Sequence, residues 1–168
     1  MVRDFRDLVA WQLADTLKCE VLAFTESGPA ARDFRFRDDI RASSASAPAN
    51  IAEGFGRFRP LQFAHFLGIA KASLVETQNH LIDARERRYI DAALFSRLRN
   101  LAKAAERATT NLLRSKLRQA DEERNQRRAM NRRRERSSRS RDDGSASPAA
   151  DHGGASPRSD RSQHRKNQ

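Results

Sequence analysis

Residues 36–57, FRDDIRASSASAPANIAEGFGR, carry the strongest structural signal in the sequence. The six residues at positions 42–47 are all Ala or Ser, which predicts a helix face that a second helix can approach closely. We expect this helix over residues 33–53. It should bend at Pro48, because proline removes a backbone donor from the helix.

The end of this helix predicts a polar network. Asn50, Glu53 and Arg57 are three or four residues apart, so they share one face if the helix persists. Buried polar groups must be hydrogen-bonded, and such networks often fix the packing register. A structural role is therefore favoured over a functional site, although both remain open. The predicted network consists of Arg41, Asn50, Glu53, Arg57, Ser73 and Glu76.

Three further segments have helical periodicity, over residues 5–24, 60–84 and 91–112, with apolar residues every three or four positions. Gly28 and Pro29 should end the first of them. Four amphipathic helices with short links pack most simply as a bundle. The sequence therefore predicts an all-α fold, an antiparallel up-down-up-down four-helix bundle spanning residues 1–118.

Residues 119–168 differ in composition from the rest of the chain. They are almost without large apolar residues, and nine arginines lie between positions 124 and 141. Polar, Ser/Gly/Pro-containing sequence cannot bury enough surface to offset the cost of ordering. We expect the last helix to fray out by about residue 134 and the tail to be disordered. The net charge of +11 divides into +6 before residue 119 and +5 after it.

Several groups of residues resemble one known family. The first group is Ser46, Pro48, Asn50, Ile51, Ala52, Glu53, Gly54 and Arg57. The others are Phe5, Asp7, Leu8 and Trp11; Phe63, Phe66, Leu67, Ile69, Ala70, Ser73, Glu76 and Leu81; and the pair Tyr89 and Ile90. Over residues 5–112 the chain resembles the four-helix-bundle proteins encoded in intervening sequences of bacterial 23S rRNA genes. It departs from the family in having a single arginine, Arg41, beside Ile40, and in having Ala47 and Ala72 where Ile and Gly are usual.

The resemblance implies properties that the spacing does not. Related proteins form ring-like homopentamers. A related branch serves diversity-generating retroelements as accessory proteins that engage nucleic acid and a reverse transcriptase. We therefore expect a homo-oligomer, a pentamer by resemblance, with a reverse transcriptase or another protein as a further possible partner.

The sequence offers no convincing catalytic or metal site. Cys19 has no histidine near it in the sequence, and nucleophilic catalysis needs an adjacent base. His65 and His80 are about four helical turns apart, too far to share a metal. Di-metal bundles need Glu-x-x-His on two helices, whereas this chain has only Glu76 and His80 at a spacing of four. We expect no enzyme activity, no cofactor and no metal.

The basic charge predicts a polyanionic partner, because lysine and arginine release condensed counterions when they neutralise phosphates. A merely solvated basic surface is the alternative. The tail lacks aromatic residues, so its binding should be electrostatic and sequence-tolerant. The candidate contacts are Arg57, Arg59, Lys71, Arg85, Arg87, Arg88, Arg114, Lys116, Arg118, Arg127, Arg128, Arg132, Arg133 and Arg134.

Two functional hypotheses follow. The first is a non-enzymatic oligomeric bundle that binds RNA or DNA through its basic surface and tail. The second is a protein-interaction scaffold whose basic charge is incidental. No segment approaches the roughly 20 apolar residues of a membrane span, and the N-terminus lacks a secretory pattern, so we expect a cytoplasmic protein without membrane contact.

Overall fold

The chain folds into helices throughout the part that the structure describes. The structure is a computed structural model and describes residues 3–57 and 59–142. In chain order the elements are the 3-10 helix η1 (Phe5–Asp7) and the α-helices α1 (Val9–Phe24), α2 (Gly28–Arg32), α3 (Phe34–Phe55), α4 (Pro60–Glu86) and α5 (Ala92–Asp142). The prediction of an all-α chain with four long helices is confirmed.

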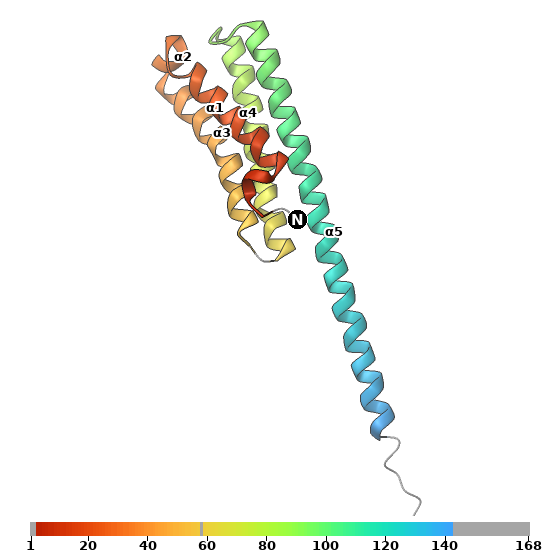
Figure 1. Ribbon diagram of the computed structural model, residues 1–168. Helices are drawn as coiled ribbons and strands as arrows, with labels where there is room; N and C mark the ends of the chain where they lie inside the picture. Colours follow the sequence, from red (N-terminus) through yellow and green to blue (C-terminus); the bar gives the residue numbers. More distant parts are fainter. Residues whose placement is uncertain (1–2, 58, 143–168) are drawn as a thin grey trace, which may run out of the picture. The chain divides into compact units, whose positions relative to one another are not determined.

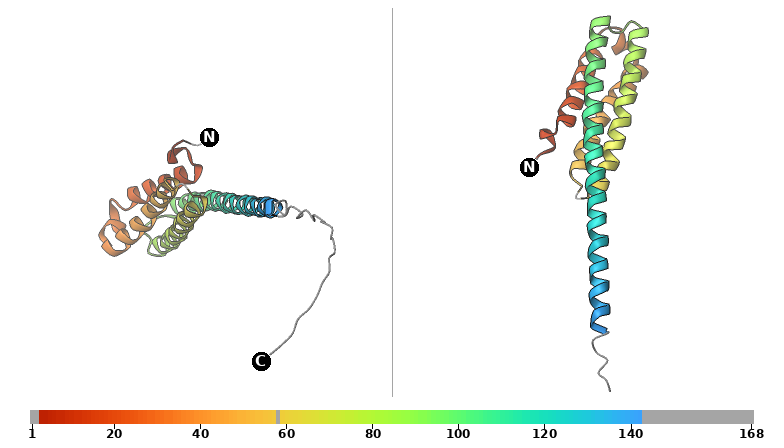
Figure 2. Two further views of the ribbon diagram at one scale, coloured as in Figure 1. Left: turned by 90° about the horizontal axis from the view of Figure 1, so that it is seen from below. Right: turned by 90° about the vertical axis from the view of Figure 1, so that its right-hand side faces the viewer.

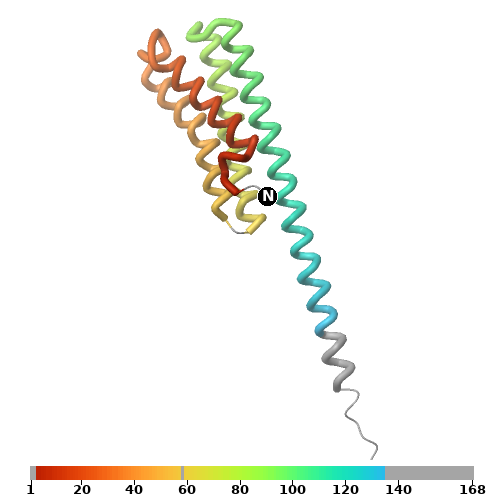
Figure 3. Tube along the Cα trace, in the orientation of Figure 1, coloured from red at the N-terminus to blue at the C-terminus, as the bar shows by residue number. Residues whose placement is uncertain are grey.

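The four long helices lie side by side in a compact unit that spans Met1–Arg127 (Figures 1 and 2). α3 packs most extensively on α4 and next on α1, and Figure 3 traces these three neighbouring helices. The core is built from leucine and isoleucine side chains of all four long helices. Its largest fully buried apolar members are Leu17, Ile40, Ile51, Leu67, Leu74, Leu81, Leu98 and Val21.

The start of α3 is set by Asp33, which the sequence analysis had placed inside the helix. Its Oδ1 accepts a hydrogen bond from the Phe36 backbone N–H at 3.1 Å, so Asp33 is the N-cap. The preceding link also differs from the prediction. Gly28 adopts a positive φ of 74°, and the next residues form the short helix α2 instead of a simple turn. α3 then continues without interruption past the buried Pro48.

The end of α4 is closed by a pair of backbone hydrogen bonds. The Tyr89 N–H donates to the Ala84 carbonyl at 2.8 Å, and the Arg88 N–H donates to the Arg85 carbonyl at 3.1 Å. This is the Schellman arrangement, which requires a left-handed residue after the C-cap. Arg88 takes that position with a φ of 62°, a conformation that glycine adopts more easily.

Residues 119–142 continue α5 as helix, which therefore extends past residue 134, where it was expected to fray out. The physical reason lies in residues 119–136, which contain no glycine, proline or β-branched residue and consist mainly of good helix formers. Helix propensity therefore extends α5 through this segment despite its low hydrophobicity. The prediction for residues 143–168 lies outside the described residues.

No helix in residues 3–57 and 59–142 combines the length and apolar character that crossing a membrane requires.

Candidate nucleic-acid interface

The net positive charge of the chain lies almost entirely on α5. Residues 1–91 contain 13 lysines and arginines against 13 aspartates and glutamates, so they are neutral overall. α5 contains 16 lysines and arginines against 6 acids. The chain's excess of positive charge is therefore a property of one helix.

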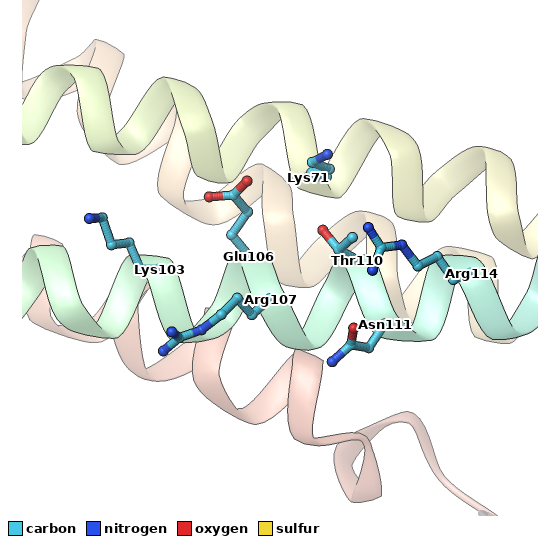
Figure 4. Close-up of a pocket in the computed structure, with 7 residues that line it drawn as sticks. All are labelled: Lys71, Lys103, Glu106, Arg107, Thr110, Asn111 and Arg114. Atoms are coloured by element: carbon cyan, nitrogen blue, oxygen red, sulfur yellow. The ribbon is translucent and has the colours of Figure 1, made fainter.

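A groove of about 520 Å³ lies between α4 and α5 (Figure 4). It is lined by Lys71 from α4 and by Lys103, Glu106, Arg107, Thr110, Asn111 and Arg114 from α5. Each α5 residue of this groove lies three or four positions from another one in the set, so together they form one face of that helix. Figure 4 shows their side chains gathered along this face, with Lys71 across from them.

Four of these side chains are cationic and one is anionic. Within the described residues, Lys71, Lys103, Arg107 and Arg114 make no ion pair with a carboxylate. The one carboxylate, Glu106, is instead tied to α4, because the Gln78 Nε2 donates to its Oε2 at 3.0 Å. The cations are thus available to an anionic ligand.

The opposite edge of α5 is used for packing. The Arg97 guanidinium donates to both carboxylate oxygens of Glu20 on α1, at 2.6 and 2.8 Å. These hydrogen bonds and the charge of Glu20 raise the pKa of Arg97. Arg97 therefore fixes α5 against α1 and belongs to the bundle more than to the groove.

Sequence reasoning found part of this groove. It named Lys71 and Arg114 but missed Lys103 and Arg107. These two residues are four positions apart on the exposed face of α5. They were recognisable from the sequence, since residues 92–118 contain seven basic residues against Glu106 alone.

Arg57 and Arg59 lie elsewhere, at the α3–α4 turn. They line a second hollow of about 450 Å³ together with Leu61, Gln62, His65 and Phe66. Arg57 pairs with Glu53 at 2.5 Å and lies over the Phe66 ring at 5.0 Å. Arg57 is therefore already engaged, whereas Arg59 forms no ion pair with a described carboxylate.

Arg87, predicted as a nucleic-acid contact, joins α4 to the start of α3. It pairs with Asp33 at 2.9 Å and with Asp83 at 2.7 Å, and the Tyr89 hydroxyl donates to Asp33 at 2.8 Å. Hydrogen bonds from the Phe36 backbone, Tyr89 and Arg87 lower the pKa of Asp33. The hydrogen bond to Asp83 is the largest of the effects that raise the pKa of Arg87. The ion pairs and hydrogen bonds that join Asp33, Asp83, Arg87 and Tyr89 are here called the Asp33 clamp. They give Arg87 a structural role.

The remaining basic candidates are spread along the chain. Arg85, in the last turn of α4, and Arg88, in the link to α5, are both exposed. The Lys116 ammonium lies 5.4 Å from the centre of the Phe63 ring, so its stem covers the bundle core. The exposed candidates on the rest of α5 are Arg118, Arg127, Arg128, Arg132, Arg133 and Arg134.

The structure assembles only part of the predicted polar network. The Asn50 amide donates to the Ser46 carbonyl at 2.8 Å, and the hydroxyls of Ser46 and Ser73 are 2.9 Å apart. Thr77 extends this chain of contacts, because its hydroxyl bonds to Ser43 at 3.1 Å and to the Ser73 carbonyl at 2.8 Å. The network is a hydroxyl ladder between α3 and α4, formed by Ser43, Ser46, Asn50, Ser73 and Thr77.

The other predicted members lie outside this ladder. The Arg41 Nε donates to the Thr25 hydroxyl at 2.7 Å, which joins α3 to the end of α1. Glu53 pairs with Arg57 on the surface, and Glu76 is exposed. The longer charged residues reach solvent, whereas the short serines and Thr77 fit between the closely packed helices.

Comparison with known proteins agrees with this fold. A family model described as "23S rRNA-intervening sequence protein" matches residues 6–111, which is more than half of the chain. The comparison with curated proteins gives no significant match. The matched residues run from η1 to the middle of α5 and contain both halves of the hydroxyl ladder. The chain therefore belongs to the 23S rRNA-intervening sequence protein family.

Proposed function

We propose that this chain is a non-enzymatic, oligomeric bundle of antiparallel up-down-up-down topology that binds RNA or DNA through the basic surface of α5. The observation that carries the proposal is the separation of charge, with a neutral stretch over residues 1–91 and a strongly basic α5. A basic surface needed only to keep the protein in solution has no reason to concentrate on one helix. Binding of a polyanion, in contrast, requires that the basic side chains of the protein lie side by side.

The chemistry of the groove favours a phosphodiester backbone as the ligand. Lysine and arginine bind phosphate as a point charge and as a planar fork, respectively. None of the seven described residues that line the groove is aromatic, so bases have no stacking platform there. Binding should therefore be salt-dependent and tolerant of sequence, and the basic residues after residue 118 should add to it.

The test is a salt titration with full-length protein and fluorescent RNA and DNA. The variant Lys103→Gln/Arg107→Gln removes two charges from the groove, while the control Arg3→Gln/Arg32→Gln removes two exposed charges from the N-terminal part of the chain. If both groove residues contact phosphate, the slope of log K against log salt should fall by about 1.4 to 1.8 for the groove variant only. Equal effects of the two variants would contradict binding at this site.

The oligomeric part of the proposal is supported by an exposed apolar stripe on α4. Leu61, Val75 and Ile82 are 63%, 49% and 47% exposed. With Gly68 and Ala72 they follow a spacing of 7, 4, 3 and 7 residues, which is the heptad pattern of helix association. Light scattering should give a mass of several chains, a pentamer by family resemblance, and Val75→Asp/Ile82→Asp should lower it.

The same stripe favours the alternative function, a protein-interaction scaffold or accessory protein. In that case the partner is a different protein, such as a reverse transcriptase, and the basic charge is incidental. Failure of full-length protein to bind any nucleic acid at physiological salt, with a monomeric mass, would favour this alternative.

A further inference from the structure

One feature of the α4–α5 groove does not fit a site for phosphate alone. Glu106 places a carboxylate among four cations, where it repels any phosphate that enters. It is also held in place, because Gln78 donates to its Oε2 at 3.0 Å. Figure 4 shows this carboxylate on the α4-facing side of the helix, between Lys103 and Thr110.

A fixed carboxylate in such a groove is suited to accept a hydrogen bond from the ligand. An ionised carboxylate has about four acceptor positions, and Gln78 occupies one of them. The ligand must therefore present donors in alternation with phosphates. An RNA strand does so, since each nucleotide carries a 2′-hydroxyl beside its phosphate, and a DNA strand lacks that donor.

We propose that the α4–α5 groove binds an RNA strand in preference to DNA, with Glu106 accepting a hydrogen bond from a ribose 2′-hydroxyl between phosphates held by Lys103, Arg107 and Arg114. This inference rests on the proposed function and names its ligand. The eleven steps from Lys103 to Arg114 give a rise of about 16 Å along α5. At roughly 3.4 Å per stacked nucleotide this length covers about five nucleotides. Thr110 and Asn111 supply further groups that both donate and accept.

Three oligonucleotides of one unstructured sequence test the inference: RNA, DNA and 2′-O-methyl RNA. The methylated strand keeps the ribose oxygen and loses its donor. Full-length protein should bind RNA at least about fivefold more tightly than either of the other two, as expected for one hydrogen bond to a charged group. Equal affinity for RNA and 2′-O-methyl RNA would overturn the assignment to Glu106.

Variants separate hydrogen bonding from charge. Glu106→Gln should tighten binding of DNA, because it removes the charge that repels phosphate, and it should lower the RNA preference, because a neutral amide oxygen accepts a weaker hydrogen bond than a carboxylate. Glu106→Asp keeps the negative charge but holds the carboxylate one methylene group closer to the α5 backbone. It should therefore also reduce the preference for RNA. The control Glu122→Gln makes the same charge change at an exposed position of α5 outside the groove, so it should leave the preference intact. A preference that survives both Glu106 substitutions would refute the inference.

The two proposals fail in different ways. If Lys103→Gln/Arg107→Gln leaves the affinity for every oligonucleotide unchanged, the groove is not the binding site and the proposed function fails there. If that variant weakens binding of RNA and DNA equally while wild-type protein does not distinguish them, only the RNA assignment fails. Circular dichroism of each variant checks that the helices remain folded.

Discussion

Replacing Gly54 by alanine should destabilise the bundle, because this glycine lies where α3 and α4 approach closely. A Cβ atom at this position would lie 2.6 Å from the Phe63 Cδ2 and 2.9 Å from the Phe66 Cβ. Phe63 is only 5% exposed, so its ring has little room to rotate, and the Phe66 Cβ moves only with the α4 backbone. Overpacking of this kind costs about 1–3 kcal/mol. The helix propensity of alanine returns at most about 1 kcal/mol.

We expect Gly54→Ala to lower the free energy of unfolding by about 1–2 kcal/mol, which corresponds to roughly 4–8 °C in Tm for a unit of this size. Thermal and urea unfolding followed by circular dichroism measure the change. Gly56→Ala is the matched control, two residues away. Its φ is −70° and its nearest contact is a backbone oxygen at 3.4 Å, so it should be neutral or stabilising by up to about 1 kcal/mol. A Gly54→Ala protein as stable as the Gly56→Ala protein would refute the close-packing argument.

Three further predictions concern the caps and the hydroxyl ladder. The pKa of Asp33 is lowered in the fold, so its contribution to stability is complete above the ordinary carboxyl pKa near 3.9 and is lost as pH falls through the lower folded value. Asp33→Asn should therefore reduce the urea midpoint at neutral pH and flatten its decline below pH 5; an unchanged pH profile would contradict the clamp. Arg88→Gly should raise the free energy of unfolding by about 1 kcal/mol in urea titrations, because glycine adopts the φ of 62° without strain; a loss of stability would count against this. Thr77→Val should cost about 1–2 kcal/mol in the same assay, since it removes the hydroxyl that bonds to Ser43 and to the Ser73 carbonyl, and an unchanged midpoint would show that the ladder is neutral.

The periodicity of the sequence predicted the helices because burial follows spacing. Leu67, Leu74 and Leu81 lie seven residues apart in the helix predicted over residues 60–84, and all three are fully buried. Val9 is also an apolar residue of a predicted helix, over residues 5–24, but it is 61% exposed at the first turn of α1. Spacing defines a face, but it does not determine whether a neighbouring helix extends far enough to cover that face at its end.

The candidate site was harder to predict than the fold, because availability depends on partners that are distant in sequence. Arg87, directly after α4, and Lys103 on α5 are both basic and exposed. Asp33, 54 positions earlier in the chain, engages Arg87, whereas Lys103 faces the groove. Glu106 gives the same lesson, since its contact with Gln78 spans 28 positions. Local charge patterns identify the basic helix, and tertiary contacts decide which of its cations can bind.

The separation of charge also makes the two parts of the proposed function respond oppositely to salt. If copies associate through the stripe on α4, the neutral character of residues 1–91 leaves little repulsion between their contacting surfaces, whereas the basic α5 helices repel one another. Added salt screens that repulsion, so it should favour assembly. Salt should weaken nucleic-acid binding at the same time, because releasing condensed counterions into a more concentrated salt solution gains less free energy. Assembly that strengthens with salt while RNA affinity falls would therefore assign the two activities to α4 and α5, respectively. If assembly and RNA affinity both decline as salt is added, the oligomer is itself held together by the basic surface.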